Sequence, residues 1–153
     1  MDLKEFLIEA KKQTYANETV EKKESSRKGS HDYEYSNGYF IYHDTYFGGI
    51  NFMGEEVVYK DLKTPIWGMN YYGITLDQNL SEEAMDKALR PALMMVGVDD
   101  IIPVRGPKKY INGNYKYVFK VSGDLNCFEG EESIYINDKK VYTLKCHGGK
   151  IIR

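Results

Sequence analysis

Apolar residues near the start of the chain recur at the spacing of an amphipathic helix. They lie on one helical face: Leu3, Phe6, Leu7 and Ala10. Asp2 precedes this face and Glu5 follows three residues later, which is the pattern of a capping box. The pattern predicts a helix over residues 2–14.

A second helix is predicted by the segment "LSEEAMDKAL" at 80–89. Ser81 is a good N-cap, and the two glutamates after it favour the positive end of the helix dipole. The apolar positions that follow form one face: Ala84, Met85, Ala88 and Leu89. Pro91 is expected to kink or stop this helix, because proline has no backbone N–H to donate.

Between and after the helices, one order of motifs occurs twice. Each helix is followed by an arginine and a nearby glycine, first Arg27 and then Arg105. An Asn-Gly pair comes next, at 37–38 and 112–113, between aromatic or β-branched runs, which strongly indicates a tight hairpin. The segment "FMGEEVVY" at 52–59 then matches "FEGEESIY" at 128–135.

This order predicts an α+β fold built from two tandem repeats of a helix and four strands. The repeats span residues 1–77 and 78–153 of one domain, 1–153. One helix and four strands alone would leave a sheet face and an open edge uncovered. We therefore expect the halves to join into one twisted antiparallel sheet of about eight strands, with both helices on one face.

The composition narrows the classes of function. A net charge of -2 disfavours a general surface for nucleic acid or anionic membranes. The 14 tyrosines favour strands and a partly wet aromatic surface. The first residues, "MDLKEFLIEAKK", carry too many charges for a signal peptide, and no run reaches the ~20 apolar residues of a membrane span, so we expect a cytoplasmic protein.

The cysteine and histidine positions do not match a metal site. Cys127 and Cys146 are 19 residues apart, and we expect both thiols to be reduced. His31, His43 and His147 show no ligand spacing either. The sequence therefore predicts no metal and no cofactor.

Several segments in order resemble one bacterial family, domain of unknown function 5680: "ESSRKGSHDYEY", "DTYFGGINFMGEEVVY", "PIWGMNYYG" and "HGG". The resemblance runs from about Leu3 to Ile152. It implies a module found alone or behind a helix-turn-helix DNA-binding domain, and so an effector-sensing or partner-binding role. Since no such domain precedes these residues, the resemblance implies no direct DNA binding, and it supplies no catalytic residues.

The glutamates of the two Gly-Glu-Glu segments have either a structural or a catalytic role. Adjacent strand residues point to opposite faces, so each pair places one glutamate on each side of the sheet. We expect a structural ion pair in each half, from Arg27 to Glu55 or Glu56 and from Arg105 to Glu131 or Glu132, with Glu56 and Glu132 as the preferred partners. Alternatively, Glu55 or Glu131 acts with His147 in acid–base catalysis of a hydrolase or isomerase type.

Positions that differ in chemistry between the repeats are the best candidates for a site. Trp67 corresponds to Tyr142, Tyr72 to His147, and His43 is aligned with Phe119. Trp67 and Met69 are expected in the core, which leaves the opposite face of that strand for binding. The expected ligand-binding residues are Tyr39, Tyr42, Trp67, Asn70, Tyr72 and His147.

The sequence thus favours a non-enzymatic, sensor-like binding domain that uses an aromatic face of its sheet. Its partner would be a small molecule or another protein, with no nucleic acid and no membrane. The acid–base enzyme is the alternative, and self-association through an edge strand or the tyrosine-rich face is a third. The sequence leaves the oligomeric state open.

Overall fold

The computed structural model describes residues 1–153 and contains two helices and one eight-stranded sheet. The first half contains α1 (Leu3–Lys12), β1 (His31–Asn37), β2 (Phe40–Gly48), β3 (Asn51–Lys60) and β4 (Thr64–Thr75). The second half contains α2 (Glu82–Leu93), β5 (Lys109–Asn112), β6 (Tyr115–Asp124), β7 (Cys127–Ile136) and β8 (Lys139–Lys150).

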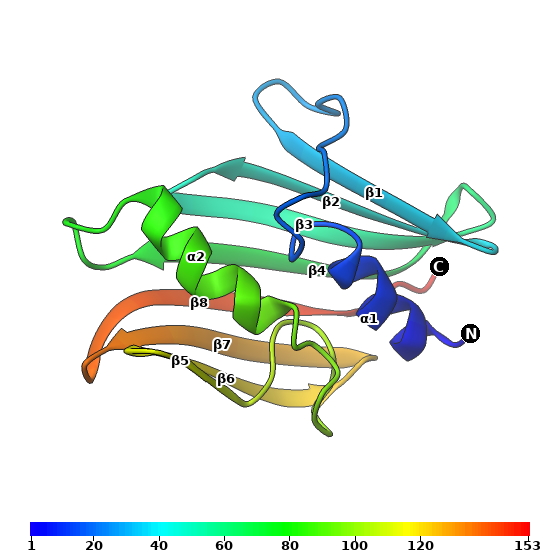
Figure 1. The fold of residues 1–153 in the computed structure, drawn as a ribbon. Coiled ribbons are helices and arrows are strands. Elements are labelled where there is room, and N and C mark those ends of the chain that lie inside the picture. The colour runs from blue at the N-terminus through cyan, green and yellow to red at the C-terminus, as the bar shows by residue number, and fades with distance from the viewer.

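The strand order is β1-β2-β3-β4-β8-β7-β6-β5, and all neighbours are antiparallel. The last strands of the two halves therefore meet at the centre of the sheet. Both helices lie on the same side of it (Figure 1), which we call the helix face; the other side is the open face. The predicted α+β fold is confirmed. The repeat boundary at 77/78, which stays a prediction, falls in the connection between β4 and α2.

Local sequence explains both helix starts. Asp2 and Glu5 form the predicted capping box of α1, and the Ser81 side chain accepts a hydrogen bond from the Ala84 amide at the start of α2. Pro91 was expected to kink or stop α2, and it does not stop the helix, which continues to Leu93. Burial of Ala92 and Leu93 against the sheet accounts for this last turn, which outweighs the hydrogen bond that proline cannot make.

The two Asn-Gly turns also form as predicted. Gly38 and Gly113 have φ of 62° and 58°, in the left-handed region that glycine adopts without steric cost. They join β1 to β2 and β5 to β6, which places the two short hairpins at the outer edges of the sheet.

Alternation along β4 sets the two faces. Trp67, Met69 and Tyr71 are buried on the helix face, whereas Asn70 and Tyr72 are exposed on the open face. The prediction that Trp67 and Met69 belong to the core is confirmed. Most aromatic rings of the sheet thus lie beneath the helices, and the open face is largely polar.

No helix of the structure has the length and apolar character needed to cross a membrane. Both cysteines are free thiols; Cys127 is exposed and Cys146 is buried.

Candidate functional site

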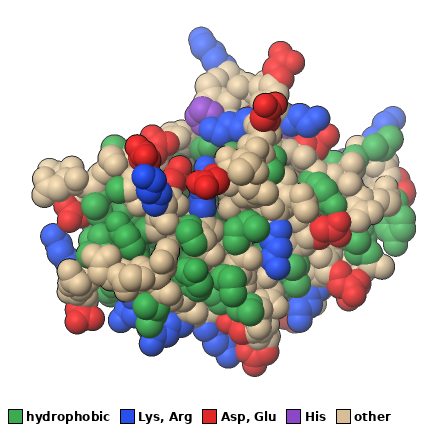
Figure 2. Space-filling view, in the orientation of Figure 1, with side chains coloured by type: hydrophobic (Ala, Val, Ile, Leu, Met, Phe, Trp, Pro, Cys, Tyr) green, Lys and Arg blue, Asp and Glu red, His purple; other side chains and the backbone are tan.

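A cavity of about 80 Å³ lies between α2 and the first half of the sheet. Five aromatic rings form much of its wall: Tyr15, Tyr33, Tyr46, Phe52 and Tyr71. Asp44 and Arg105 contribute the buried polar groups, and α2 contributes Glu82, Asp86 and Arg90. In Figure 2, charged and hydrophobic side chains lie close together on this side of the molecule, over the region that α2 occupies in Figure 1.

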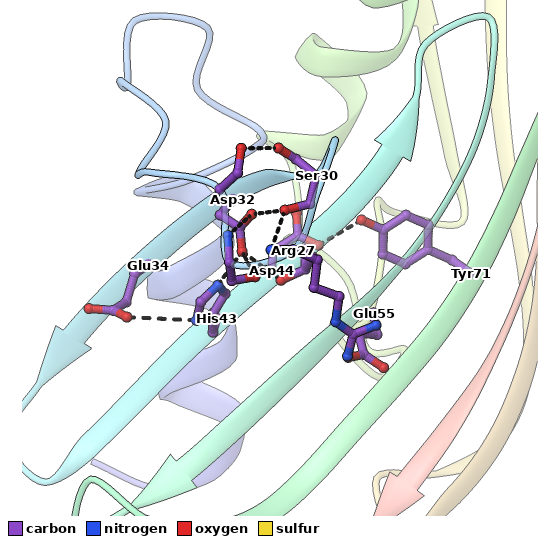
Figure 3. A network of polar contacts seen from close by, with 11 residues as sticks. Arg27, Ser30, Asp32, Glu34, His43, Asp44, Glu55 and Tyr71 are labelled. Atoms are coloured by element: carbon purple, nitrogen blue, oxygen red, sulfur yellow. Dashed lines mark hydrogen bonds and ion pairs between the residues drawn. The ribbon is translucent and has the colours of Figure 1, made fainter.

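Asp44 is the buried acid of this cavity. It lies on the helix face of β2, and the Tyr71 hydroxyl donates a hydrogen bond of 2.6 Å to its Oδ1 (Figure 3). Burial, followed by the nearby negative charge of Glu56, raises the pKa of Asp44 to about 8. A carboxyl group with such a pKa beside a cavity can hold or release a proton near neutral pH.

Arg105 reaches the cavity from the segment before β5, but its charge is already paired. Its Nε and Nη2 donate to the two oxygens of Glu132 at 3.0 and 2.7 Å. The Tyr117 and Tyr142 hydroxyls also donate to Glu132. The guanidinium lies over the ring of Tyr15, 5.4 Å from its centroid. Arg105, Tyr117, Glu132 and Tyr142 are buried, and each oxygen of Glu132 accepts two hydrogen bonds, so this carboxylate has a complete set of partners.

The corresponding carboxylate of the first half, Glu56, is less well satisfied. Lys11 of α1 donates to its Oε2, while its Oε1 has no hydrogen-bond partner. The hydroxyl of Tyr42 is also buried without a partner. Burial lowers the pKa of Lys11, and the adjacent Glu56 opposes this shift. The first half therefore buries polar groups at an energetic cost that the second half avoids.

Strand pairing corrects one alignment made from the sequence. Asp44 pairs with Glu56 across β2 and β3, and Phe119 pairs with Glu132 across β6 and β7. Phe119 therefore corresponds to Asp44, not to His43, because the length of the β2–β3 turn region shifts the repeat by one residue. Asp44, the buried acid of the cavity, therefore occupies the position that the buried Phe119 has in the second half.

The two arginines of the repeat lie on opposite faces of the sheet. Arg105 pairs with Glu132 on the helix face, as predicted, and its side chain is 4% exposed. Arg27 contacts Glu55, the other predicted partner, at 2.9 Å on the open face and is 61% exposed, so the preferred pairing with Glu56 is wrong. Its loop passes over the open face of β1 and β2, and Lys11 takes the place beside Glu56.

Asp32 anchors that loop to the open face (Figure 3). It accepts hydrogen bonds from four side chains: Ser26, Ser30, Thr45 and, at 2.6 Å, His43 Nε2. Burial alone would raise the pKa of Asp32, but these hydrogen bonds hold it well below its usual range. Since the serine hydroxyls donate to Asp32 and not to His43, the cluster lacks the order of a nucleophilic triad.

The six residues expected to bind a ligand do not form one surface. Tyr42 and Trp67 are fully buried beneath the helices, and Tyr39 lies at the β1–β2 turn. Asn70 and His147 are directly paired across β4 and β8 on the open face, with Tyr72 on the same side of β4. These six residues therefore do not form a contiguous exposed aromatic patch.

The alternative catalytic residues also lie on the open face. Glu131 and His147 line the same shallow depression, and Glu55 lies further across the sheet in a separate one. Lys140 donates to Glu131 at 3.0 Å and lowers its pKa, which is opposite to the shift that a general acid needs. No group of three histidine, cysteine, aspartate or glutamate side chains could hold a metal ion.

The sequence interpretation missed Asp44, Tyr71 and Arg90 as parts of one site. One signal was available on β2, where every second residue faces the helices: Phe40, Tyr42, Asp44 and Tyr46. A single carboxylate in a row of aromatic residues on a buried strand face indicates either a buried partner or a ligand. The contribution of α2 depends on how the helix packs, which this pattern does not describe.

Comparison with known proteins gives one match. The family described as Domain of unknown function (DUF5680) matches residues 44–151, which is more than half of the chain, and the chain therefore belongs to this family. No curated protein and no solved structure matches it.

Proposed function

We propose that this member of the DUF5680 family is a sensor-like domain that binds a small molecule in the cavity between α2 and the aromatic side of the sheet. The observation that carries this proposal is a cavity beneath α2 whose wall combines aromatic rings with a buried carboxyl group, Asp44. Ligand sites typically combine an apolar wall with a few placed polar groups in this way.

The size of the cavity supports a small ligand. One water molecule needs roughly 10–15 Å³ of such space, so about 80 Å³ accommodates a molecule of roughly five to eight non-hydrogen atoms. The three depressions on the open face contain one Phe, Tyr or Trp ring among them, Phe128. They offer a small molecule far fewer aromatic contacts than the cavity does.

The difference between the two halves gives independent support. At the position of Asp44 the second half has Phe119, which fills space and needs no partner. A buried carboxyl group costs stability unless it is paired, so a role in binding explains its presence in the first half better than packing does.

Acid–base catalysis in the same cavity is the second candidate function. The raised pKa of Asp44 favours it, because a group that titrates near pH 8 exchanges protons readily under physiological conditions. If the protein is an enzyme, the wild type should convert the bound molecule into a product. The Asp44→Asn variant should leave the same molecule unchanged.

We also propose that the protein works in the cytoplasm. The two free thiols support this location, since extracellular compartments favour disulfides.

A cavity-filling substitution tests the binding proposal. Leu89 is buried at the cavity wall, so Leu89→Phe should fill the space, whereas Leu76→Phe makes the same change at an exposed position. Native mass spectrometry should detect a small molecule retained by the wild type and by Leu76→Phe but not by a folded Leu89→Phe variant. Retention of the same molecule by all three proteins would contradict a site in this cavity.

A ligand identified in this way should also stabilise the wild type. At a concentration 100 times its dissociation constant, the expected gain is about 2.7 kcal/mol, measured by denaturant unfolding. The Leu89→Phe variant should gain much less.

A further inference from the structure

The positive groups around the cavity are already paired within the protein. Arg105 is held by both oxygens of Glu132. Arg90 donates to the Tyr15 carbonyl at 2.6 Å and lies 3.6 Å from Asp86. Neither guanidinium is left as an unpaired charge for an anionic ligand.

Two acidic groups of the cavity, in contrast, lack such partners within the protein. Asp44 is 2% exposed and accepts one hydrogen bond, from Tyr71 to Oδ1, so its Oδ2 has no protein donor. At the mouth, Glu82 makes no ion pair; its carboxylate lies against Gly49, where an added Cβ would be 2.5 Å from Oε2. The neighbouring Glu83 is paired with Lys87 at 3.0 Å. The groups of the site that lack an ion-pair partner are therefore acidic.

The aromatic wall also favours a positively charged ligand. The faces of tyrosine and phenylalanine rings carry negative electrostatic potential and attract cations, most strongly where water is excluded. Rings surround the cavity from β1, β2, β3 and β4 and from the segment after α1. Tyr15 and Tyr71 already carry the Arg105 guanidinium, 5.4 and 5.8 Å from their centroids, which shows that these rings accept a cation.

We propose that the ligand is a small organic cation, a primary or secondary alkylammonium ion whose N–H groups donate to the free oxygen of Asp44 while its alkyl part contacts the tyrosine rings. This inference rests on the proposed binding function and specifies its ligand class. Glu82 at the mouth would favour entry of the cation, since acidic groups raise the local concentration of positively charged ligands.

Binding of this cation is coupled to release of a proton. Burial and Glu56 keep Asp44 protonated near neutral pH, whereas an ammonium ion favours the carboxylate. The proton that leaves Asp44 passes to the buffer. The groups that shift the pKa of Asp44 come from four other segments: Lys11, Glu56, Tyr71 and Arg105. From α2, Glu82, Asp86 and Arg90 line the same cavity. Affinity should rise by up to tenfold per pH unit below about pH 8 and level off above it.

Three molecules of nearly equal shape test the charge preference. We expect 3-methylbutylammonium to bind, 3-methylbutanol to bind at least tenfold more weakly, and 3-methylbutanoate to show no binding by isothermal titration calorimetry. Measurements in buffers of different ionisation enthalpy should detect proton release with the ammonium ion alone.

Two substitutions of the same kind separate the role of Asp44 from a general effect of charge. Asp44→Asn keeps the shape of the side chain and should weaken ammonium binding at least tenfold, abolish its pH dependence, and leave the weak binding of the alcohol unchanged. Asp138→Asn, at an exposed turn of the second half, should behave as the wild type. Thermal unfolding of both variants checks that they are folded.

The inference is overturned if the alcohol or the carboxylate binds as tightly as the ammonium ion, if the ammonium ion does not bind, or if Asp44→Asn binds it as the wild type does. The proposed function survives these results as long as the cavity retains another molecule that Leu89→Phe loses. The proposed function is also contradicted if the protein retains no small molecule and none of the three probes binds.

Discussion

The two halves of the sheet bury a glutamate at corresponding positions but treat it differently. Glu132 is held by Arg105 through two hydrogen bonds and by the hydroxyls of Tyr117 and Tyr142. Glu56 has only Lys11, and one of its oxygens has no partner. Lysine donates from a single point, whereas the flat guanidinium of arginine spans both carboxylate oxygens.

The surrounding residues extend this difference. Tyr42 corresponds to Tyr117 but its hydroxyl has no partner, and Trp67 corresponds to Tyr142 but donates to the Leu125 carbonyl at 3.0 Å. The second half thus completes its polar network internally, whereas the first half leaves one oxygen of Glu56 and the hydroxyl of Tyr42 unpaired. The comparison teaches that two halves with the same order of elements can differ in this way: one satisfies its buried polar groups, and the other leaves polar groups from which a site can be built.

The largest expected effect separates the two arginines. Arg105→Met should leave Glu132 buried without its cation and reduce the free energy of unfolding by about 3–5 kcal/mol. Arg27→Met should cost no more than about 1 kcal/mol, because its pair with Glu55 is exposed. Urea denaturation of both variants measures the difference; similar losses would show that the two pairs are equivalent after all.

Replacing both members of each buried ion pair by apolar residues should give the next largest difference in stability between the two halves. Lys11→Met with Glu56→Leu removes a pair that is only partly satisfied, and we expect little change in stability. Arg105→Met with Glu132→Leu leaves the hydroxyls of its two tyrosines without an acceptor, at a cost of about 1–3 kcal/mol for each.

The free energies of unfolding of the two double variants and the wild type, measured at one pH, give the change in stability for each pair. A large loss in the first-half variant would mean that bound water satisfies Glu56 and Tyr42 in solution.

Single hydroxyl deletions sharpen the same comparison. Tyr117→Phe removes a donor to a buried carboxylate and should cost about 1.5–3 kcal/mol. Tyr42→Phe removes a hydroxyl that has no partner and should be neutral or slightly stabilising. Thermal unfolding of the matched pair tests this, and equal destabilisation would contradict the asymmetry.

A pH dependence of stability is expected from Asp44 in addition. Its pKa is about 8 in the folded protein and near 3.8 when unfolded, so between about pH 4 and 8 the folded state holds a proton that the unfolded state has released. Stability should therefore fall as pH rises through this window, by up to about 1.4 kcal/mol per pH unit. Asp44→Asn should lose this slope.

Free energies of unfolding at several pH values measure the difference between wild type and variant. Asp138→Asn is the control and should keep the slope of the wild type. A difference curve that is flat from pH 4 to 8 would show that Asp44 is ionised throughout in the folded protein.

Local patterns determined most of the fold. The capping residues Asp2 and Ser81 determine where the helices begin, the Asn-Gly pairs set the outer hairpins, and alternation along β4 separates the buried Trp67 from the exposed Asn70. These features depend on residues a few positions apart, so their physics is contained in the sequence. The repeated order also predicted one sheet, since neither half can cover its own apolar face.

Tertiary structure decided the site. Glu56 and Glu132 have the same local sequence, yet Lys11 reaches one and Arg105 the other, because the connection containing Arg27 crosses to the open face. The cavity likewise depends on α2 packing over strands of the other half. Such contacts join residues far apart in the chain, and their partners are set by how the layers pack, which local periodicity does not specify.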